Sequence, residues 1–189
     1  YEINDIIVFL KLIINPFDLK SLAAVLRSPF VLINDTQLYL IIEQLNNGIL
    51  FDKLIFKPEY FKKRDTIKMR DFLKFILEYN NFFSAFEPGE LINAVINKFE
   101  YKEFLASQFN GLRKIANVDK LINLAYNFSA KGGIDKFILL IEKLMKVQSA
   151  EAEAELLDEN ANVVKIMTVH QSKGLEFPIV IIPDAGRGL

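Results

Sequence analysis

Apolar residues in the first part of the chain recur every three or four positions, which is the spacing of one face of an α-helix. The pattern covers three segments, residues 3–14, 19–26 and 38–45. Residues that commonly end helices follow each segment: Asn15-Pro16, Ser28-Pro29 and Gly48. Asp18 and Asp35 stand just before the second and third segments, so we expect their carboxylates to cap those helices. The pattern therefore predicts three short helices.

The middle of the chain continues with the same helical period. Further apolar stripes lie at residues 69–76, 91–99, 118–128 and 137–145. A shorter helix is expected around Phe104 and Leu105. Pro88-Gly89 suits the start of the 91–99 helix, because proline is favoured in a first helical turn. No stretch of useful length alternates as a half-buried strand would, so we predict an all-α region up to about Val147.

The pattern changes beyond this region. Residues 149–162 are rich in Ala and Glu and contain no basic residue, so they either extend the preceding helix or form a solvated connector. We favour a mobile or exposed connector. Residues 163–169 and 179–182 are short, mostly apolar runs of the kind that form buried strands in a parallel sheet. We therefore predict a mainly α fold, a multi-helix region followed by a short β-containing fragment of an α/β domain.

Composition and charge limit the classes of function. Apolar residues make up 51% of the chain, which excludes a disordered protein. The 23 basic and 24 acidic residues nearly cancel, so any contact with nucleic acid has to be local. The absence of Cys and the single His exclude disulfides, thiolate metal sites and His-rich metal sites, and they fit a cytoplasmic protein. The apolar run 6–14 is too short to span a membrane and the first residues do not resemble a signal peptide, so we expect no membrane contact.

The loop Thr168–Glu176 holds the candidate chemistry. It contains the only histidine of the chain, His170, together with Lys173, and both side chains carry donors suited to phosphate. Gly174 allows a ligand to approach the backbone closely. An ordinary turn between two strands is the alternative interpretation. No nucleophile–base pair and no metal-binding group is recognisable, so we expect no catalytic residue and no metal site in this chain.

Residues 165–178, Lys-Ile-Met-Thr-Val-His-Gln-Ser-Lys-Gly-Leu-Glu-Phe-Pro, resemble motif V of the superfamily 1 helicases of the UvrD/PcrA/RecB type. The resemblance is long and almost unbroken. It implies that the segment lies in the second RecA-like domain, where Thr168 and His170 would contact single-stranded DNA. Gly174 and Glu176 would contact ATP. Ser172 and Lys173 would shape or line the loop.

A second resemblance covers residues 15–30, Asn-Pro-Phe-Asp-Leu-Lys-Ser-Leu-Ala-Ala-Val-Leu-Arg-Ser-Pro-Phe, with Asp35 and Leu38 after them. This segment is similar to the start of the helical insertion of the AddA (RexA) family of ATP-dependent helicase/nuclease subunits. The resemblance implies that residues 1–162 are a helical 2B-like subdomain, including the acidic connector. Residues 163–189 would be the return of the chain into RecA-like domain 2A.

The AddA resemblance also implies cofactors and partners for the parent enzyme. These are ATP and Mg²⁺, single- and double-stranded DNA, and a second nuclease subunit of the AddB (RexB) type, acting together in double-strand-break repair and recombination in the cytoplasm. The sequence contains no Gly-x-x-x-x-Gly-Lys-Ser/Thr loop to hold the nucleotide phosphates. The arginine-containing motif VI is expected beyond Leu189. We therefore expect this segment to be inactive alone, and the alternative is a free-standing helical interaction module without catalysis.

The chain departs from the UvrD pattern at one point. UvrD-type 2B subdomains carry a Gly-Ile-Gly hairpin that approaches duplex phosphates, and Leu32-Ile33-Asn34 stands in its place here. The missing glycines hinder a close backbone approach, which puts duplex contact at this point in doubt. Arg27, Arg113 and Lys114 are further candidate DNA contacts, with surface or salt-bridging roles as the simpler interpretation.

Overall fold

A computed structural model describes residues 1–50, 53–128 and 132–155, the last eight of these by their backbone, and residues 164, 166, 168, 170, 172–174 and 176–182. By its internal contacts the chain forms two units, Tyr1–Val147 and Gln148–Leu189. The predicted boundary between residues 162 and 163 falls outside the described residues. That boundary stays a prediction.

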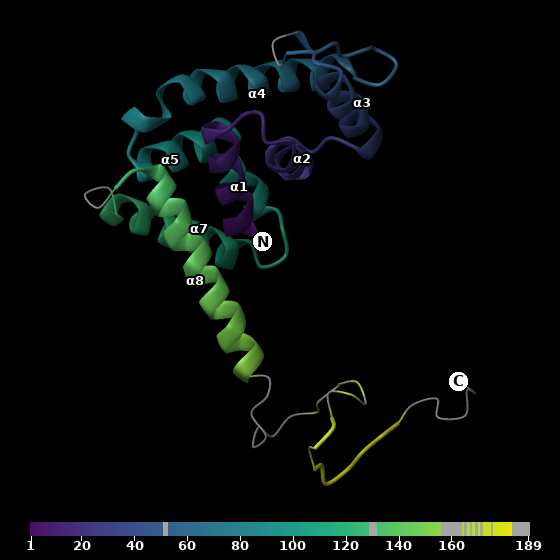
Figure 1. Cartoon of the computed structure of the whole chain (residues 1–189), viewed down its shortest axis with the longest axis vertical. Helices are drawn as coiled ribbons and strands as arrows, with labels where there is room; N and C mark the ends of the chain where they lie inside the picture. Colours follow the sequence, from purple (N-terminus) through teal and green to yellow (C-terminus); the bar gives the residue numbers. More distant parts are fainter. Residues whose placement is uncertain are drawn as a thin grey trace. The chain divides into compact units, whose positions relative to one another are not determined.

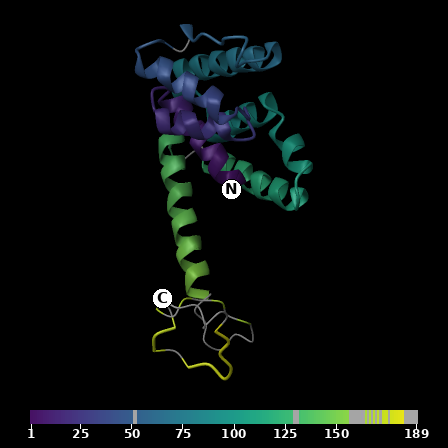
Figure 2. The same cartoon turned by 90° about the vertical axis from the view of Figure 1, so that its right-hand side faces the viewer.

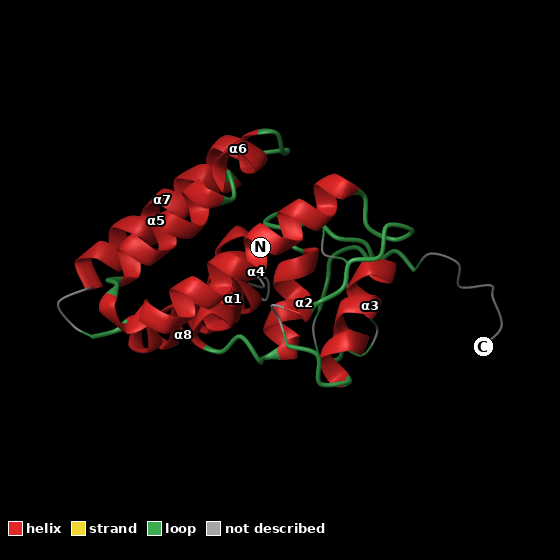
Figure 3. Cartoon of the chain, turned by 90° about the horizontal axis from the view of Figure 1, so that it is seen from above, coloured by secondary structure: helices red, strands yellow, loops and turns green. Residues whose placement is uncertain are grey.

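Within these ranges the structure is helical, and no described residue lies in a β-strand (Figure 3). The helices are α1 (Glu2–Ile14), α2 (Leu19–Arg27), α3 (Asp35–Asn46), α4 (Lys63–Phe82), α5 (Pro88–Lys98), α6 (Tyr101–Ala106), α7 (Gly111–Phe128) and α8 (Ile134–Glu155), with the short 3₁₀ helix η2 (Phe83–Ala85) after α4. The mainly α class is thereby confirmed. None of the described helices combines the length and the apolar character that a membrane crossing requires.

Helix α1 is the centre of the first unit. It packs against α2, α4, α5 and α7, and α5 and α7 lie side by side next to it (Figure 1). Apolar side chains on all sides of α1 are buried as a result: Ile6, Ile7, Phe9, Leu10, Leu12 and Ile13. α4 runs along the edge of the unit in both Figure 1 and Figure 2.

A cluster of aromatic rings fills the space around α1. The Phe9 ring centroid lies 4.8 Å from that of Phe30, 5.9 Å from Phe72, 6.1 Å from Phe75 and 5.2 Å from Phe99. Most of these rings meet edge to face, which is the arrangement that their charge distributions favour. Residues from four separate parts of the chain thus share one core.

Most of the predicted helix ends are confirmed, and one is wrong by a single residue. Asp18 caps α2, because its Oδ1 accepts a hydrogen bond from the Lys20 N–H (3.1 Å). α3, however, is capped by Asn34, and Asp35 is its first helical residue. The Asn34 side chain accepts from the Gln37 N–H (2.9 Å), and the Gln37 side chain accepts from the Asn34 N–H (3.1 Å). This reciprocal pair satisfies two backbone donors, which Asp35 alone would not do.

Two glutamines on α3 hold the loop that precedes α4. Gln37 Nε2 donates to the Tyr60 carbonyl at 2.9 Å. Seven residues further on, Gln44 donates to the Ile55 carbonyl (3.1 Å) and accepts from the Ile55 N–H (2.8 Å). These side chains bond backbone groups that have no partner in a helix or strand. They hold the loop that leads into α4 against α3.

The last helix is longer than the sequence pattern predicts. α8 continues to Glu155, so the backbone of residues 149–155 extends the helix, as one of the two alternatives for the acidic segment has it. The alternative that we favoured, a connector, is therefore wrong for residues 149–155. Residues 156–162 lie outside the described residues. Within the first unit, Lys11 on α1 and Glu142 on α8 form a short ion pair.

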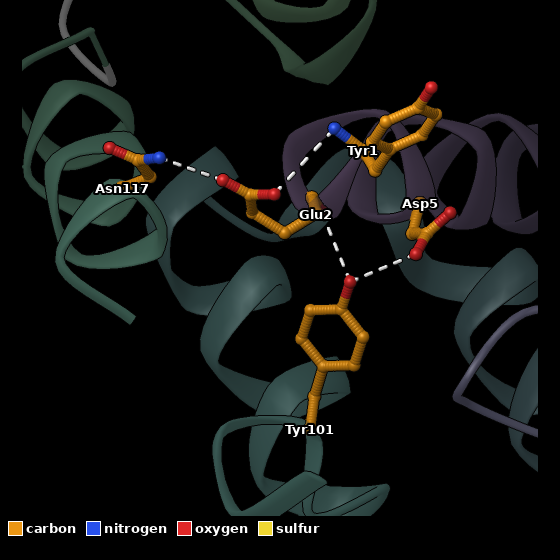
Figure 4. Close-up of polar contacts among 5 residues, drawn as sticks. All are labelled: Tyr1, Glu2, Asp5, Tyr101 and Asn117. Carbon is orange, nitrogen blue, oxygen red and sulfur yellow. Dashed lines mark hydrogen bonds and ion pairs between the residues drawn. The ribbon is translucent and has the colours of Figure 1, made fainter. Parts of the chain in front are cut away.

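A polar cluster joins the start of α1 to α6 and α7 (Figure 4). The Tyr101 hydroxyl donates to Asp5 Oδ2 at 3.0 Å and lies 3.3 Å from the Glu2 carbonyl oxygen. Asn117 donates to the Glu2 carboxylate (2.7 Å), which also lies 3.6 Å from the amino group of Tyr1. Burial raises the pKa of Asp5, and burial beside that carboxylate raises the pKa of Tyr101. The phenol therefore stays protonated and serves as a donor.

Candidate functional site

The described residues at the start of the predicted site loop lie in a turn. The Thr168 carbonyl accepts a hydrogen bond from the Ser172 N–H (3.1 Å), and the His170 carbonyl accepts one from the Lys173 N–H (3.4 Å). Both bonds are local, one spanning four residues along the chain and the other three, as in a single turn. The structure thus brings the first four predicted site residues into one turn, with Gly174 directly after them.

Most of the polar side chains of this turn are open to solvent. Thr168, His170, Lys173 and Glu176 are exposed, and Ser172 is partly buried. A hydroxyl, an imidazole, an ammonium and a carboxylate are therefore accessible on one short segment. The hydroxyl, imidazole and ammonium groups can donate hydrogen bonds to an anionic ligand, and the carboxylate can accept one from a ligand hydroxyl.

Gly174 has a backbone conformation that few other residues adopt. Its φ is +89°, in the left-handed region, and a Cβ built there would meet no heavy atom within 4 Å. The requirement for glycine in the isolated chain is therefore conformational rather than one of space. The open surroundings also leave the backbone accessible, and contact of this glycine with a ligand stays a prediction.

The apolar runs on either side of the turn do not form strands within the described residues. Val164 and Ile166 are 93% and 97% exposed, and Ile179 and Ile181 are 81% and 84% exposed. A β-strand needs at least one neighbouring strand for its backbone hydrogen bonds, and the described residues supply none. The β-containing fragment stays a prediction, part of which concerns residues outside the described ones.

The segment that replaces the glycine-rich hairpin lies far from this turn in the sequence. Leu32 holds a φ of +61° although it is not glycine, and its side chain is 56% exposed. The Ile33 N–H donates to the Leu26 carbonyl (3.0 Å), and Asn34 caps α3. The backbone thus adopts a turn with a left-handed residue, but it carries a large side chain where a close approach would need none. Arg27, a candidate DNA contact, instead pairs with Asp35 at 3.2 Å.

A cavity of about 480 Å³ opens beside Leu32 and contains a group of cations that the sequence analysis did not single out. Lys62, Arg64 and Lys68 line it, together with Asp65 and Tyr60. Lys68 Nζ donates to the Val31 carbonyl (2.8 Å), and burial, together with the charge of Arg64, lowers the pKa of Lys68. The run Lys62-Lys63-Arg64 is the feature of the sequence from which this group could have been predicted. Among the described residues, no three His, Asp or Glu side chains gather to hold a metal ion.

A family model for the UvrD-like helicase C-terminal domain matches residues 1–189, the whole chain. The chain belongs to this family. The match includes both the helical unit and the site turn of this UvrD-like domain, and it confirms the resemblance that the motif at residues 165–178 indicates.

Curated relatives of this UvrD-like domain are ATP-dependent helicase/nuclease subunits A. The protein from Carboxydothermus hydrogenoformans is 33% identical over 185 residues, which is 95% of this chain and 15% of that protein. Those from Listeria monocytogenes serotype 4b and Bacillus pumilus are each 30% identical, over 98% of this chain and 15% of their own length. The domain thus spans about 15% of the length of the relatives that it matches.

Proposed function

We propose that this chain is the part of an ATP-dependent DNA helicase/nuclease subunit in which one loop contacts both the nucleotide and single-stranded DNA. The observation that carries the proposal is the turn Thr168–Glu176. It presents polar side chains and an open glycine backbone within a chain that matches the UvrD-like helicase family along its whole length. A segment that touches two ligands can make the binding of one depend on the state of the other.

Each residue of the turn has a role in this proposal. Thr168 and His170 bind phosphates of the DNA strand through a hydroxyl and an imidazole. The Gly174 backbone approaches the nucleotide, and the Glu176 carboxylate accepts a hydrogen bond from a ribose hydroxyl. Ser172 and Lys173 shape or line the loop. The exposure of His170, Lys173 and Glu176 supports these roles, because ligands can reach them.

The proposal also assigns the apolar runs beside the turn to a domain of the parent enzyme. In this proposal residues 163–169 and 179–182 are strands of RecA-like domain 2A, and residues 1–162 are the 2B-like subdomain inserted ahead of them. Strong exposure of the branched apolar side chains of Val164, Ile166 and Ile181 supports it, since a sheet would bury such side chains.

The parent enzyme would use ATP and Mg²⁺ and would act in the cytoplasm on DNA with broken ends, together with a second nuclease subunit of the AddB type. The sequence holds no Walker A loop to bind the nucleotide phosphates. The isolated chain is therefore proposed to be inactive. The family match covers both units, which favours this proposal over a free-standing interaction module.

The test uses the complete helicase subunit that carries this chain, with Glu176→Ala and His170→Ala made separately. We expect Glu176→Ala to raise the KM for ATP about tenfold, the loss of roughly one hydrogen bond in a dry site, while DNA affinity without nucleotide stays within about twofold. His170→Ala is expected to weaken single-stranded DNA binding and to leave the DNA-independent KM for ATP unchanged.

Glu59→Ala serves as the control, because Glu59 is also an exposed carboxylate but lies outside the turn. An unchanged KM for ATP in Glu176→Ala, or an equal rise of that KM in Glu59→Ala, contradicts the proposal. Circular dichroism of each variant establishes that the fold is intact.

A further inference from the structure

A second cavity, of about 710 Å³, lies between α4 and the loop that precedes this helix. Leu54 and Phe56 of the loop and Leu73 and Leu77 of α4 line it, so much of its surface is apolar. Phe82, at the end of α4, extends this apolar lining and is 62% exposed. Cavities of several hundred cubic ångströms with mainly apolar walls are typical of ligand-binding sites.

The loop wall of this cavity is held in place by contacts with the rest of the unit. Gln44 on α3 bonds both the carbonyl and the N–H of Ile55 (3.1 and 2.8 Å). Leu54 and Phe56, on either side of Ile55, are buried, and the Phe56 ring packs against Phe61 with the centroids 5.1 Å apart. A wall that is already ordered loses little conformational entropy when a ligand binds.

Two cations stand beside the apolar lining. Residues 53–74 hold eight of the 23 basic residues and three of the 24 acidic ones, and Arg70 and Lys74 of this segment line the cavity. Both are exposed and lie one turn apart on the same side of α4. The Arg70 guanidinium lies 5.8 Å from the centroid of the Phe56 ring. Among the described residues, no carboxylate forms an ion pair with either cation, so an anionic group of a ligand could pair with both.

The other end of the cavity has a different polarity. Glu78 lies one turn beyond Lys74, is exposed and lines the cavity together with Asn81. A ligand with uniform negative charge would be repelled by Glu78 and would gain nothing from the apolar lining. A peptide can place carboxylates at one end, large apolar side chains in the middle and neutral groups at the other end. It therefore matches all three parts of the cavity.

We propose that the cavity between α4 and the preceding loop binds an acidic peptide segment of a partner protein. Large apolar side chains of the peptide pack against Leu73 and Leu77, and its carboxylates pair with Arg70 and Lys74. From Arg70 to Asn81, at about 1.5 Å of rise per residue, the site is about 16 Å long, which is the length of about five extended residues. Burial of the apolar side chains supplies most of the affinity, and the charges fix the direction of the peptide.

This inference concerns a different surface from the turn Thr168–Glu176. It does not depend on the role proposed for that turn.

The test selects binders of the full 189-residue chain from random peptides of about twelve residues displayed on phage, long enough to span the site. Peptides that also bind the double variant Arg70→Glu and Lys74→Glu are removed. We expect the remaining peptides to combine Asp or Glu with Leu, Ile, Phe or Trp. The most enriched peptide, labelled with a fluorophore, is then measured by anisotropy. Its affinity should fall at least about tenfold in the double variant and about fivefold in Phe82→Ser.

The matched controls make the same changes away from the cavity. Lys120→Glu with Lys143→Glu reverses two exposed cations on α7 and α8, and Phe109→Ser removes a phenylalanine that is 88% exposed. We expect both controls to stay within about twofold of the parent chain, and circular dichroism of each variant checks the fold.

The proposal is overturned if no peptide is enriched, if the enriched peptides lack either acidic or large apolar residues, or if the control variants lose as much affinity. It also fails if duplex DNA or vesicles of anionic lipid bind more tightly than the peptide and lose as much affinity in Phe82→Ser, because the apolar lining would then serve that ligand.

Discussion

Leu32 illustrates what a sequence pattern cannot give at the scale of one residue. The sequence shows that Leu32-Ile33-Asn34 lacks the glycines of the related hairpin. It gives no indication that Leu32 still adopts φ +61°, because a branched side chain disfavours that conformation. The hydrogen bonds from Leu32 to Ser28 and from Ile33 to Leu26, together with the cap at Asn34, hold this turn in place. Tertiary and capping interactions here override the preference of the residue.

Leu32→Gly should therefore be tolerated and should raise the free energy of unfolding by up to about 1 kcal/mol, because glycine relieves the left-handed strain. Leu139→Gly is the matched control, since Leu139 is also 56% exposed but lies within α8. We expect it to lower the free energy of unfolding by about 1 kcal/mol. Urea unfolding of both variants checks the pair, and equal destabilisation would show that Leu32 is not strained.

The sequence predicted which residues of the site turn carry polar chemistry, but it did not predict how the backbone of the turn is arranged. The chemistry of His170, Lys173 and Glu176 follows from the residue types alone, whereas the left-handed φ of Gly174 does not. The hydrogen bonds from Ser172 to Thr168 and from Lys173 to His170 depend on backbone angles that side-chain chemistry does not determine. Their roles toward ATP and DNA stay predictions, because ligands and neighbouring domains decide them.

At the scale of elements, apolar spacing predicted where helices occur more accurately than where they begin. The cap of α3 shows why, because Asn34 and Asp35 are adjacent and both suit that position. Gln37, three residues after Asn34, was the decisive feature, since it completes the reciprocal capping pair. α4 begins at Lys63, well before its first buried apolar residue, Met69, because charged residues fill its first turns.

Gln37 links the cap of α3 to the loop before α4, so its loss should affect both elements. Gln37→Met keeps a flexible side chain of similar length but removes the bonds to Asn34 and to the Tyr60 carbonyl. We expect the free energy of unfolding to fall by about 1–2 kcal/mol. Gln108→Met is the control, because Gln108 is exposed, and it should change that value by less than about 0.5 kcal/mol. Denaturant unfolding compares the two, and an effect of the same size in both contradicts the linking role.

At the scale of the whole molecule, the net charge did not indicate how the charged residues are distributed. The near-zero sum predicted only local contacts with nucleic acid, and it conceals the positively charged segment at residues 53–74. The concentration of cations in residues 53–74 is visible in the sequence, whereas their common face on α4 follows from the helix and its burial. The predicted strands, by contrast, depend on neighbours that the described part of the chain does not supply.

The Asp5–Tyr101 bond ties the first helix to a helix almost a hundred residues later, so its loss should act on the whole first unit. At neutral pH Tyr101→Phe leaves a partly buried carboxylate without its donor, and we expect a loss of about 1–3 kcal/mol in the free energy of unfolding. Burial raises the pKa of Asp5, so its ionised form is a cost to the fold that appears as pH rises through that pKa. The destabilisation in Tyr101→Phe should therefore shrink as pH falls through the same range.

Urea unfolding at neutral pH and near pH 4 measures this dependence. Tyr126→Phe is the control, because Tyr126 is exposed and its hydroxyl accepts a bond from Asn93 at the surface. It should cost less than about 0.5 kcal/mol at either pH. A pH-independent loss in Tyr101→Phe would contradict the coupling to Asp5.

The aromatic core also constrains the order in which the protein can fold during its synthesis. Phe9 belongs to the first helix, but its ring contacts Phe72, Phe75 and Phe99, the last of them 90 residues further along the chain. At about 5–20 residues per second a ribosome needs about 5–18 s to make that distance. α2 and Phe30 can cover part of α1 early in that interval, but the side that packs against Phe99 stays without its native partner until that residue is made.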